Sequence, residues 1–345
     1  MSQIDISIII PVYGVEKYIN RFMGSIVSQT IQNFRVIFID DKTKDNSIEI
    51  ISNYNTFFGD RIVVIRNEKN MGLSAARNVG IEYVYQNPTQ YITFLDPDDW
   101  IEPEYLEDLF EKAQKYDLDL CISGISRDDE DNGAIICKEL ISMPEAVYEP
   151  INCDELAYIN PCSYAKLFRF EPIKELRYKA IKRSEDTCYL FEALKKYKKI
   201  KFTNNAYYHY CVRQSSLTGG IDREKYDSMH EEFAKLLPEF RNIGSLEEKF
   251  VTQIYIRSSL GGVCRICFKN MRNAKSMEKI EYGFLNEFIP SWRTNRYLCF
   301  FKKGIGGKKE FALRLSALLY KMHLFIVFIW VYYFFVNILK KDVRA

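Results

Sequence analysis

The sequence predicts an α/β protein with a Rossmann-like, mostly parallel central sheet flanked by helices, followed by a helical C-terminal region. In the first part of the chain, short runs rich in β-branched side chains alternate with helical stretches, which is typical of parallel βαβ units. From about Asp222 the strand signals fade and helical segments dominate. We therefore expect a first domain over residues 1–220, a helical region over 221–310 and a hydrophobic, basic tail over 311–345.

The expected strands end at residues that interrupt an apolar run. Pro11 ends the first strand because proline has no N–H to donate, and Asp40 and Asp41 close the second. A helix is expected between the third and fourth strands, where apolar residues recur with helical spacing. The expected strands cover residues 6–10, 35–39, 61–65, 91–95 and 118–123, and that helix covers residues 73–85.

Three carboxylates follow the fourth expected strand, at Asp96, Asp98 and Asp99. Because Pro97 prevents the strand from continuing, these acids lie at its carboxyl end, where open α/β sheets bind their ligands. Clustered carboxylates repel one another and usually need a compensating cation, and hard oxygen ligands suit Mg²⁺ or Mn²⁺. The alternative is a solvated acidic turn that caps a helix starting near Glu102.

The composition excludes several classes of protein. A chain of 345 residues with a net charge of +2 and 15% aromatic residues is neither a basic nucleic-acid binder nor a disordered protein. The nine cysteines are scattered without the spacing of a disulfide framework, which favours reduced thiols in the cytosol. Residues 1–13 lack a basic segment, so we expect no secretory signal.

A strongly apolar segment occupies residues 324–339. As a helix it would cover roughly 24 Å, which is less than the ~30 Å hydrocarbon core of a bilayer. Basic residues on both sides favour the cytoplasmic face. We expect a helix that lies in, or dips into, the inner leaflet; a tilted span reaching back toward Leu315 and a helix buried against protein are the alternatives. The flanking basic residues are Lys302, Lys303, Lys308, Lys309, Lys340, Lys341 and Arg344.

Four motifs occur in order at residues 7–13 (Ser-Ile-Ile-Ile-Pro-Val-Tyr), 38–47 (Phe-Ile-Asp-Asp-Lys-Thr-Lys-Asp-Asn-Ser), 70–80 (Asn-Met-Gly-Leu-Ser-Ala-Ala-Arg-Asn-Val-Gly) and 94–100 (Phe-Leu-Asp-Pro-Asp-Asp-Trp). As a set they closely resemble the family 2 glycosyltransferases of GT-A fold. Residues 163–168, 184–187 and 207–218 extend the resemblance, which covers about residues 4–218. Tyr164 and Ala165 depart from the family's usual Trp-Asn, and Gly14 replaces the commoner Asn.

The resemblance implies an inverting sugar transfer from a nucleotide-diphosphate donor, with Mn²⁺ or Mg²⁺ as cofactor. Asp186, in the segment that matches the family's Glu-Asp motif, is then the expected catalytic base, with Glu185 as its rival. Asp98 is the expected metal ligand, and Asp96 is expected to contact ribose or a metal-bound water. His209 could complete the metal shell, and a core histidine is the alternative.

The remaining nucleotide-sugar contacts are also expected from the resemblance. A turn cap for Asp41 and a surface ion pair for Arg77 are the structural alternatives. The expected contacts are Pro11 and Tyr13 with the base, Asp41 with uracil or ribose, Arg77 with the base or a phosphate, and Arg213 with the departing diphosphate.

We expect a single sugar to move from a UDP-sugar to an acceptor carried on a polyprenyl diphosphate at the cytoplasmic face of the cell membrane. This would serve bacterial capsule, exopolysaccharide or O-antigen synthesis. No nucleic-acid partner is expected, and the oligomeric state is left open. A nucleotidyltransferase, a processive synthase and a non-catalytic sugar-nucleotide-binding or scaffold subunit are the alternatives. A non-catalytic subunit would be expected to lack Asp98 or Asp186, and both are present.

Overall fold

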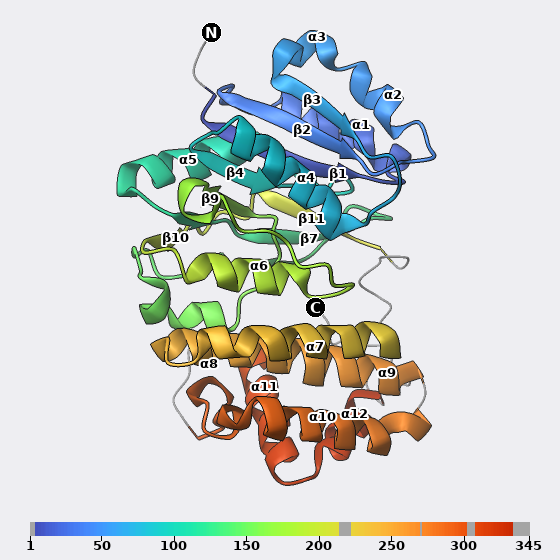
Figure 1. Cartoon of the computed structure of the whole chain (residues 1–345), viewed down its shortest axis with the longest axis vertical. Coiled ribbons are helices and arrows are strands. Elements are labelled where there is room, and N and C mark those ends of the chain that lie inside the picture. The colour runs from blue at the N-terminus through green and yellow to red at the C-terminus, as the bar shows by residue number, and fades with distance from the viewer. Residues whose placement is uncertain (1–3, 214–221, 270, 302–307, 334–345) are drawn as a thin grey trace. The chain divides into compact units, whose positions relative to one another are not determined.

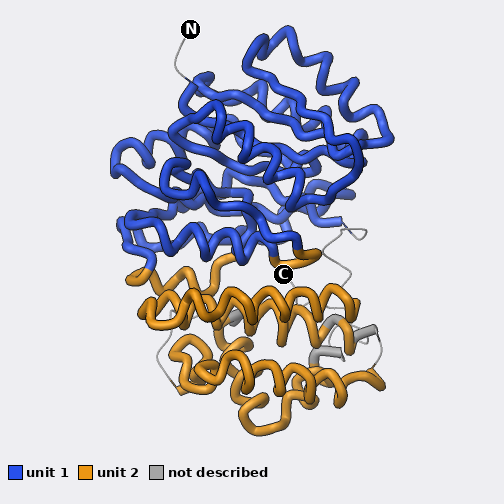
Figure 2. The backbone as a smooth tube through the Cα atoms, in the orientation of Figure 1, with its two compact units in different colours: residues 1–150, 161–180, 185–214 blue, residues 151–160, 181–184, 215–345 orange. Residues whose placement is uncertain are grey.

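The computed structural model describes residues 4–213, 222–269, 271–301 and 308–333. The chain forms two compact units (Figure 2). Residues 1–150, 161–180 and 185–214 belong to the first unit, and residues 151–160, 181–184 and 215–345 to the second. The predicted loop from Ser215 to Thr218 and the tail beyond Tyr333 lie outside the described residues.

A seven-stranded sheet lies at the centre of the first unit (Figure 1), with the strand order β10-β6-β9-β4-β1-β2-β3. Neighbouring strands pair in parallel, except that β9 runs antiparallel to β4 and β6. The predicted mostly parallel sheet is therefore confirmed. The bounds are β1 (Ile6–Val12), β2 (Phe34–Asp40), β3 (Ile62–Arg66), β4 (Tyr91–Phe94), β6 (Leu120–Ile122), β9 (Lys166–Arg169) and β10 (Ile200–Phe202).

The first strand continues further than the sequence predicted. It was expected to end at Pro11, but β1 runs to Val12 and Pro11 lies in register with Ile39 of β2. The pairing of β1 with β4 stops at Ile9. Pro11 therefore lies beyond that ladder, where its missing N–H breaks no hydrogen bond to β4.

Helices cover both faces of this sheet. The helices of the first unit are α1 (Glu16–Val27), α2 (Ser47–Ser52), α3 (Asn55–Phe58), α4 (Leu73–Gln86), α5 (Tyr105–Tyr116) and α6 (Glu185–Leu194). In α1, Phe22 packs into the cluster that includes Ile8 of β1. On the opposite face Gly80 of α4 meets Ile9, where an added Cβ would lie 2.4 Å from Ile9 Cγ2. Only glycine permits so close an approach of α4 to the sheet.

A second sheet, with the order β5-β11-β7-β8, was mostly not predicted. Its strands are β5 (Trp100–Ile101), β7 (Ile125–Asp129), β8 (Ile135–Glu139) and β11 (Tyr208–Val212). Only β11 matches a predicted segment, the tyrosine strand of the family resemblance. β8 begins with Ile135 and Ile136 but shows no alternation of apolar and polar residues, and none of its residues is buried. β5 begins directly after the acidic loop and pairs with β11, so this sheet helps to fix the loop.

The described part of the second unit contains the helices predicted beyond Asp222. The Asp222 side chain accepts a hydrogen bond from the backbone N–H of Lys225 at 2.9 Å and so caps the first of them. The segments are α7 (Arg223–Phe240), α8 (Gly244–Tyr255), the π-helical η6 (Ile256–Val263), α9 (Cys264–Lys269), α10 (Ala274–Phe288), α11 (Lys308–Lys321) and α12 (Phe325–Tyr333).

Only the first part of the apolar segment 324–339, which was expected to be helical, lies within the described residues, and it forms α12. His323, with φ of 56°, separates α11 from α12, so a span reaching back to Leu315 would have to pass through this break. α12 buries Phe325 and Ile329 and exposes residues such as Val331. Within the described ranges, no helix combines the length and apolar character needed to cross a bilayer.

Candidate active site

Three elements of the first unit bring acidic and basic side chains together. Asp96 and Asp98 follow β4 at the carboxyl end of the parallel sheet. Glu185 and Asp186 are the first residues of α6, and Arg77 lies on α4. The acids therefore occupy the edge of the sheet at which open α/β proteins bind ligands.

Arg77 is the buried cation of this group, with only 1% of the residue exposed. Its Nη1 donates to Asp186 Oδ1 at 2.6 Å, and its Nη2 donates to Asp96 Oδ1 at 3.1 Å. Glu185 Oε1 lies 3.9 Å from Nη1. The surface ion pair considered for Arg77 is therefore excluded. Two of its five N–H groups make the bonds to Asp186 and Asp96, and its Nε has no hydrogen-bond partner among the described residues.

Asp186, the predicted base, has one carboxylate oxygen held and one open. Its Oδ1 accepts hydrogen bonds from Arg77 and, at 2.7 Å, from Ser163 Oγ. No described residue donates a hydrogen bond to Oδ2, and the side chain is 23% exposed. The carboxylate is thus fixed through one oxygen, and the other can receive a proton from a bound hydroxyl.

Glu185, the rival base, is largely buried beside the same guanidinium, and a carboxyl group with a pKa near 7 suits a general base at neutral pH. Burial raises the pKa of Glu185 to about 7, the negative charge of Asp186 adds to the rise, and Arg77 opposes it. Burial also raises the pKa of Asp96, again against the attraction of Arg77. One guanidinium faces three carboxyl groups, and burial favours the protonated forms of two of them, Glu185 and Asp96.

Asp98, the predicted metal ligand, forms an ion pair with Arg213. The two side chains are 26% and 20% exposed, respectively. The Arg213 guanidinium also lies 4.6 Å from the centroid of the Tyr18 ring. Arg213 therefore reaches the acidic loop, as expected for a residue that contacts the diphosphate, and it competes with any cation for Asp98.

The third acid of the loop, Asp99, has a structural role. It is 2% exposed. Its Oδ2 accepts a hydrogen bond from the Tyr208 hydroxyl at 2.6 Å, and its Oδ1 accepts one from the Cys211 backbone N–H at 2.9 Å. These bonds join the loop after β4 to β11, so the expected cap on the helix beyond Trp100 is not its role.

Asp41 holds the loop that leads into α4. Its Oδ1 accepts hydrogen bonds from Asn67 Nδ2 and the Met71 N–H, both at 2.9 Å, and its Oδ2 accepts one from the Gly72 N–H at 2.8 Å. This geometry supports the turn-capping alternative. It also gives Asp41 a part in the site, because the loop sets the start of the helix that carries Arg77.

Pro11 and Tyr13, the predicted base contacts, lie at the carboxyl end of β1, which neighbours β4. Pro11 is buried, whereas Tyr13 is 50% exposed. An exposed aromatic ring at the ligand edge of a sheet can stack on a nucleobase. The two positions are thus compatible with the predicted base pocket.

His209 does not have the environment of a metal ligand. Its Nδ1 lies 2.6 Å from Asp128 Oδ2, and its Nε2 lies 3.0 Å from Glu102 Oε1. The imidazole stacks on Trp100, with ring centroids 3.5 Å apart. Both ring nitrogens have hydrogen-bond partners, so this geometry supports the core-histidine alternative and not the predicted metal shell.

The remaining acids can be compared with the needs of a divalent cation. The described part of the chain contains no cluster of three or more His, Cys, Asp or Glu side chains able to hold a metal. Asp96 and Asp98 are two carboxylates, about a quarter exposed, on one short loop. Mg²⁺ is often bound by one or two carboxylates together with substrate phosphates. The pair therefore fits a cation that a bound diphosphate helps to hold.

Two residues of the site were not predicted. The Tyr178 hydroxyl donates to Ser163 Oγ at 2.5 Å, and Ser163 in turn donates to Asp186. Ser163 belongs to a segment that the resemblance singled out, but no role was assigned to it. Tyr178 lies outside every motif, so no local signal could have identified it.

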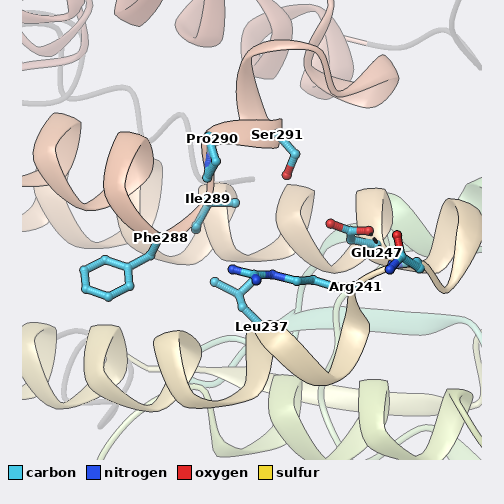
Figure 3. Close-up of a pocket in the computed structure, with 8 residues that line it drawn as sticks. Leu237, Arg241, Glu247, Phe288, Ile289, Pro290 and Ser291 are labelled. Carbon is cyan, nitrogen blue, oxygen red and sulfur yellow. Dashed lines mark hydrogen bonds between the residues drawn. The ribbon is translucent and has the colours of Figure 1, made fainter.

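A separate cavity of about 260 Å³ lies in the second unit (Figure 3). The Arg241 side chain extends between Leu237 and Ile289. None of the predicted site residues lines this cavity, and it is smaller than the roughly 300–1,000 Å³ of typical ligand pockets. We therefore assign the candidate active site to the acidic edge of the first sheet.

Replacing Arg77 by Met should strongly destabilise the first unit. The substitution keeps an elongated side chain but leaves the three surrounding carboxyl groups without their cation, so we expect the free energy of unfolding to fall by about 3–5 kcal/mol. Urea unfolding measures this loss. Arg66→Met is the matched control, because Arg66 is 71% exposed and should contribute less than about 1 kcal/mol. Equal, small effects of both substitutions would contradict the role of Arg77.

Stability should depend on pH through Glu185. Folding raises its pKa from 4.5 to about 7, so its stabilising contribution is complete below about pH 4.5 and is lost as the pH rises toward 7. Glu185→Gln cannot ionise. We expect it to match the wild type near pH 4.5 and to exceed it by on the order of 3 kcal/mol near pH 7.5. Denaturant unfolding in EDTA at both pH values tests this, and a difference independent of pH would contradict it.

Three comparisons place the chain among known proteins. Glycosyltransferase GlyA of Streptococcus pneumoniae serotype 4 is 30% identical over 224 residues, 62% of this chain and 31% of GlyA. Glycosyltransferase GlyG of the same organism is 28% identical over 238 residues, 66% of this chain and 75% of GlyG. The match thus spans about a third of GlyA.

The structure of S. aureus TarS 1–349 in complex with UDP-GlcNAc has a TM-score of 0.70 and 17% identity, and the match covers 99% of this chain and 93% of that one. This likeness confirms the predicted GT-A-like fold with a helical C-terminal region. Residues 7–177 match the model of the family described as Glycosyl transferase family 2. Through this segment, the chain belongs to the family 2 glycosyltransferases.

Proposed function

We propose that the protein transfers a single sugar from a UDP-sugar to a saccharide acceptor, with inversion at the anomeric carbon. The observation that carries this proposal is the environment of Asp186. One of its oxygens is held by Arg77 and Ser163, and the other is open to a bound hydroxyl. Arg77 joins this base to Asp96, so the base and the diphosphate-binding loop form one connected group.

The reaction would be a single displacement. Asp186 would take the proton of the acceptor hydroxyl as that oxygen attacks the anomeric carbon. The bond between the anomeric carbon and the donor diphosphate breaks, and UDP leaves with the electron pair. Because attack and departure occur on opposite faces of the sugar, the configuration inverts. No described arrangement of a nucleophile and a neighbouring base supports a covalent intermediate.

Asp98 and Asp96 would hold Mn²⁺ or Mg²⁺, whose charge offsets the negative charge of a departing diphosphate. Arg213 lies beside the same loop, and its planar guanidinium is suited to bind phosphate oxygens. UDP is the proposed nucleotide because the similar TarS fold was solved with UDP-GlcNAc. An exposed Tyr13 ring would stack on the base.

We place the acceptor on a polyprenyl diphosphate at the cytoplasmic face of the membrane, in capsule, exopolysaccharide or O-antigen synthesis. The support is the apolar tail with its basic flanks. α12 buries Phe325 and Ile329 and exposes Val327 and Val331, so part of its apolar surface faces outward. Such a surface next to lysines favours contact with anionic lipid.

Calorimetric titration with UDP and with GDP, each in Mn²⁺ and in EDTA, tests the donor site. We expect UDP to bind in Mn²⁺ and to bind much more weakly in EDTA, because the two-carboxylate set needs the cation to accept a diphosphate. Failure of both nucleotides to bind under either condition would contradict the proposed function.

Two substitutions should separate catalysis from donor binding. Asp186→Asn should lower UDP release from UDP-sugars by about 100-fold or more and leave UDP affinity nearly unchanged. Asp98→Ala should weaken UDP binding in Mn²⁺. Asp60→Asn, at an exposed position away from these contacts, is the matched control. If Asp186→Asn kept more than about a tenth of the wild-type rate, an effect under about 1.4 kcal/mol, Asp186 would not be the base.

The tail should bind membranes. We expect the full chain to sediment with vesicles that contain phosphatidylglycerol, and Val327→Glu to lower the bound fraction several-fold because it places a charge on the exposed face of α12. Val147→Glu is the control, since Val147 is similarly exposed (41% against 46%) in the first unit. Unchanged sedimentation of Val327→Glu would overturn this membrane contact.

A further inference from the structure

We propose that Ser163 and Tyr178 are positioning residues that select the oxygen of Asp186 used in catalysis. The inference rests on the proposed function and deepens it. Tyr178 donates its hydroxyl proton to Ser163 Oγ at 2.5 Å, and Ser163 donates its own to Asp186 Oδ1 at 2.7 Å. The hydrogen bonds thus run in one direction, from the phenol to the carboxylate, and we call these three residues the Tyr178 chain.

The far end of the Tyr178 chain is rigid. Tyr178 is 3% exposed, and its ring stacks on Tyr189 with centroids 4.0 Å apart and planes 1° apart. The Arg77 guanidinium lies 5.2 Å from the centroid of the Tyr178 ring. Burial raises the pKa of Tyr178 well above its usual value, so the phenol stays protonated and remains a donor.

The middle of the Tyr178 chain is fixed by its turn. Ser163 is 1% exposed. The buried Lys166 donates through Nζ to the carbonyl oxygens of Cys162, at 2.7 Å, and Tyr164, at 3.3 Å. These carbonyls flank Ser163 in the sequence, so the lysine holds the turn that presents the Ser163 hydroxyl to Asp186.

The consequence for Asp186 is an asymmetric carboxylate. Arg77 Nη1 and Ser163 Oγ both donate to Oδ1, whereas no described residue donates to Oδ2. Two donors on one oxygen prevent the carboxylate from rotating freely about its last bond. Oδ2 is therefore the oxygen presented to the acceptor, and its orientation depends on the hydroxyls of Ser163 and Tyr178.

Two single variants and their combination test the coupling. Ser163→Ala removes the bond to Asp186, and Tyr178→Phe removes the donor to Ser163 but keeps the stacked ring. Tyr189→Phe is the matched control, because the buried Tyr189 hydroxyl has no hydrogen-bond partner among the described residues. The readouts are UDP release from UDP-GlcNAc, UDP-glucose or UDP-galactose with water as acceptor, and UDP affinity in Mn²⁺ by calorimetry.

We expect kcat to fall about tenfold in Ser163→Ala and about three- to tenfold in Tyr178→Phe, with UDP affinity unchanged and Tyr189→Phe equal to the wild type. Because Tyr178 acts through Ser163, Tyr178→Phe should cause no further loss in the Ser163→Ala background. Additive losses, or equal losses in Tyr178→Phe and Tyr189→Phe, would show only a structural role and overturn the inference.

The outcomes also separate this inference from the proposed function. A wild-type rate in Tyr178→Phe, together with a lost rate in Asp186→Asn, would overturn the positioning role and leave the proposed function intact. Equal UDP release by the wild type and Asp186→Asn would contradict the role of Asp186 as base, and the positioning role would fall with it.

Discussion

The structure of the site depends on one buried guanidinium that compensates three carboxyl groups. Arg77 contacts Asp96 from the loop after β4 and Asp186 at the start of α6, and Glu185 lies within 4 Å. These segments are far apart in the sequence, so the ion pairs hold three parts of the first unit in one place. A buried charge without a partner is strongly unfavourable, which makes the position of Arg77 and the arrangement of the acids mutually dependent.

The backbone around Arg77 is correspondingly constrained. Asp41 fixes the loop before α4 through three hydrogen bonds, and Gly72, with φ of 86°, turns the chain into the helix. Gly80 lets the same helix approach β1 within contact of Ile9. Asp41, which was predicted to bind the nucleotide, thus acts together with Gly72 and Gly80. The three residues place the Arg77 guanidinium at the acidic edge of the sheet.

The sequence predicted the features of the fold and site that depend on residues close together in the chain. Apolar runs that end in proline or aspartate located the central strands and the ligand edge, and the motifs singled out Asp96, Asp98 and Asp186. The sequence did not predict the role of a residue whose hydrogen-bond partner lies far away in the chain. His209 pairs with Asp128, 81 positions away, and Tyr178 reaches Ser163 across 15 positions. β8 begins with two isoleucines but lacks the alternation of apolar and polar residues that would reveal it, because neither of its faces is buried.

The most direct test of this account is a structure of the protein with UDP and Mn²⁺. We expect Asp98 to exchange Arg213 for the cation, and Arg213 to contact the diphosphate. Arg77 should stay between Asp96 and Asp186, with Ser163 still bound to Oδ1. A complex in which Arg77 leaves both carboxylates to bind the nucleotide, or in which Asp98 keeps Arg213 and the cation lies elsewhere, would contradict it.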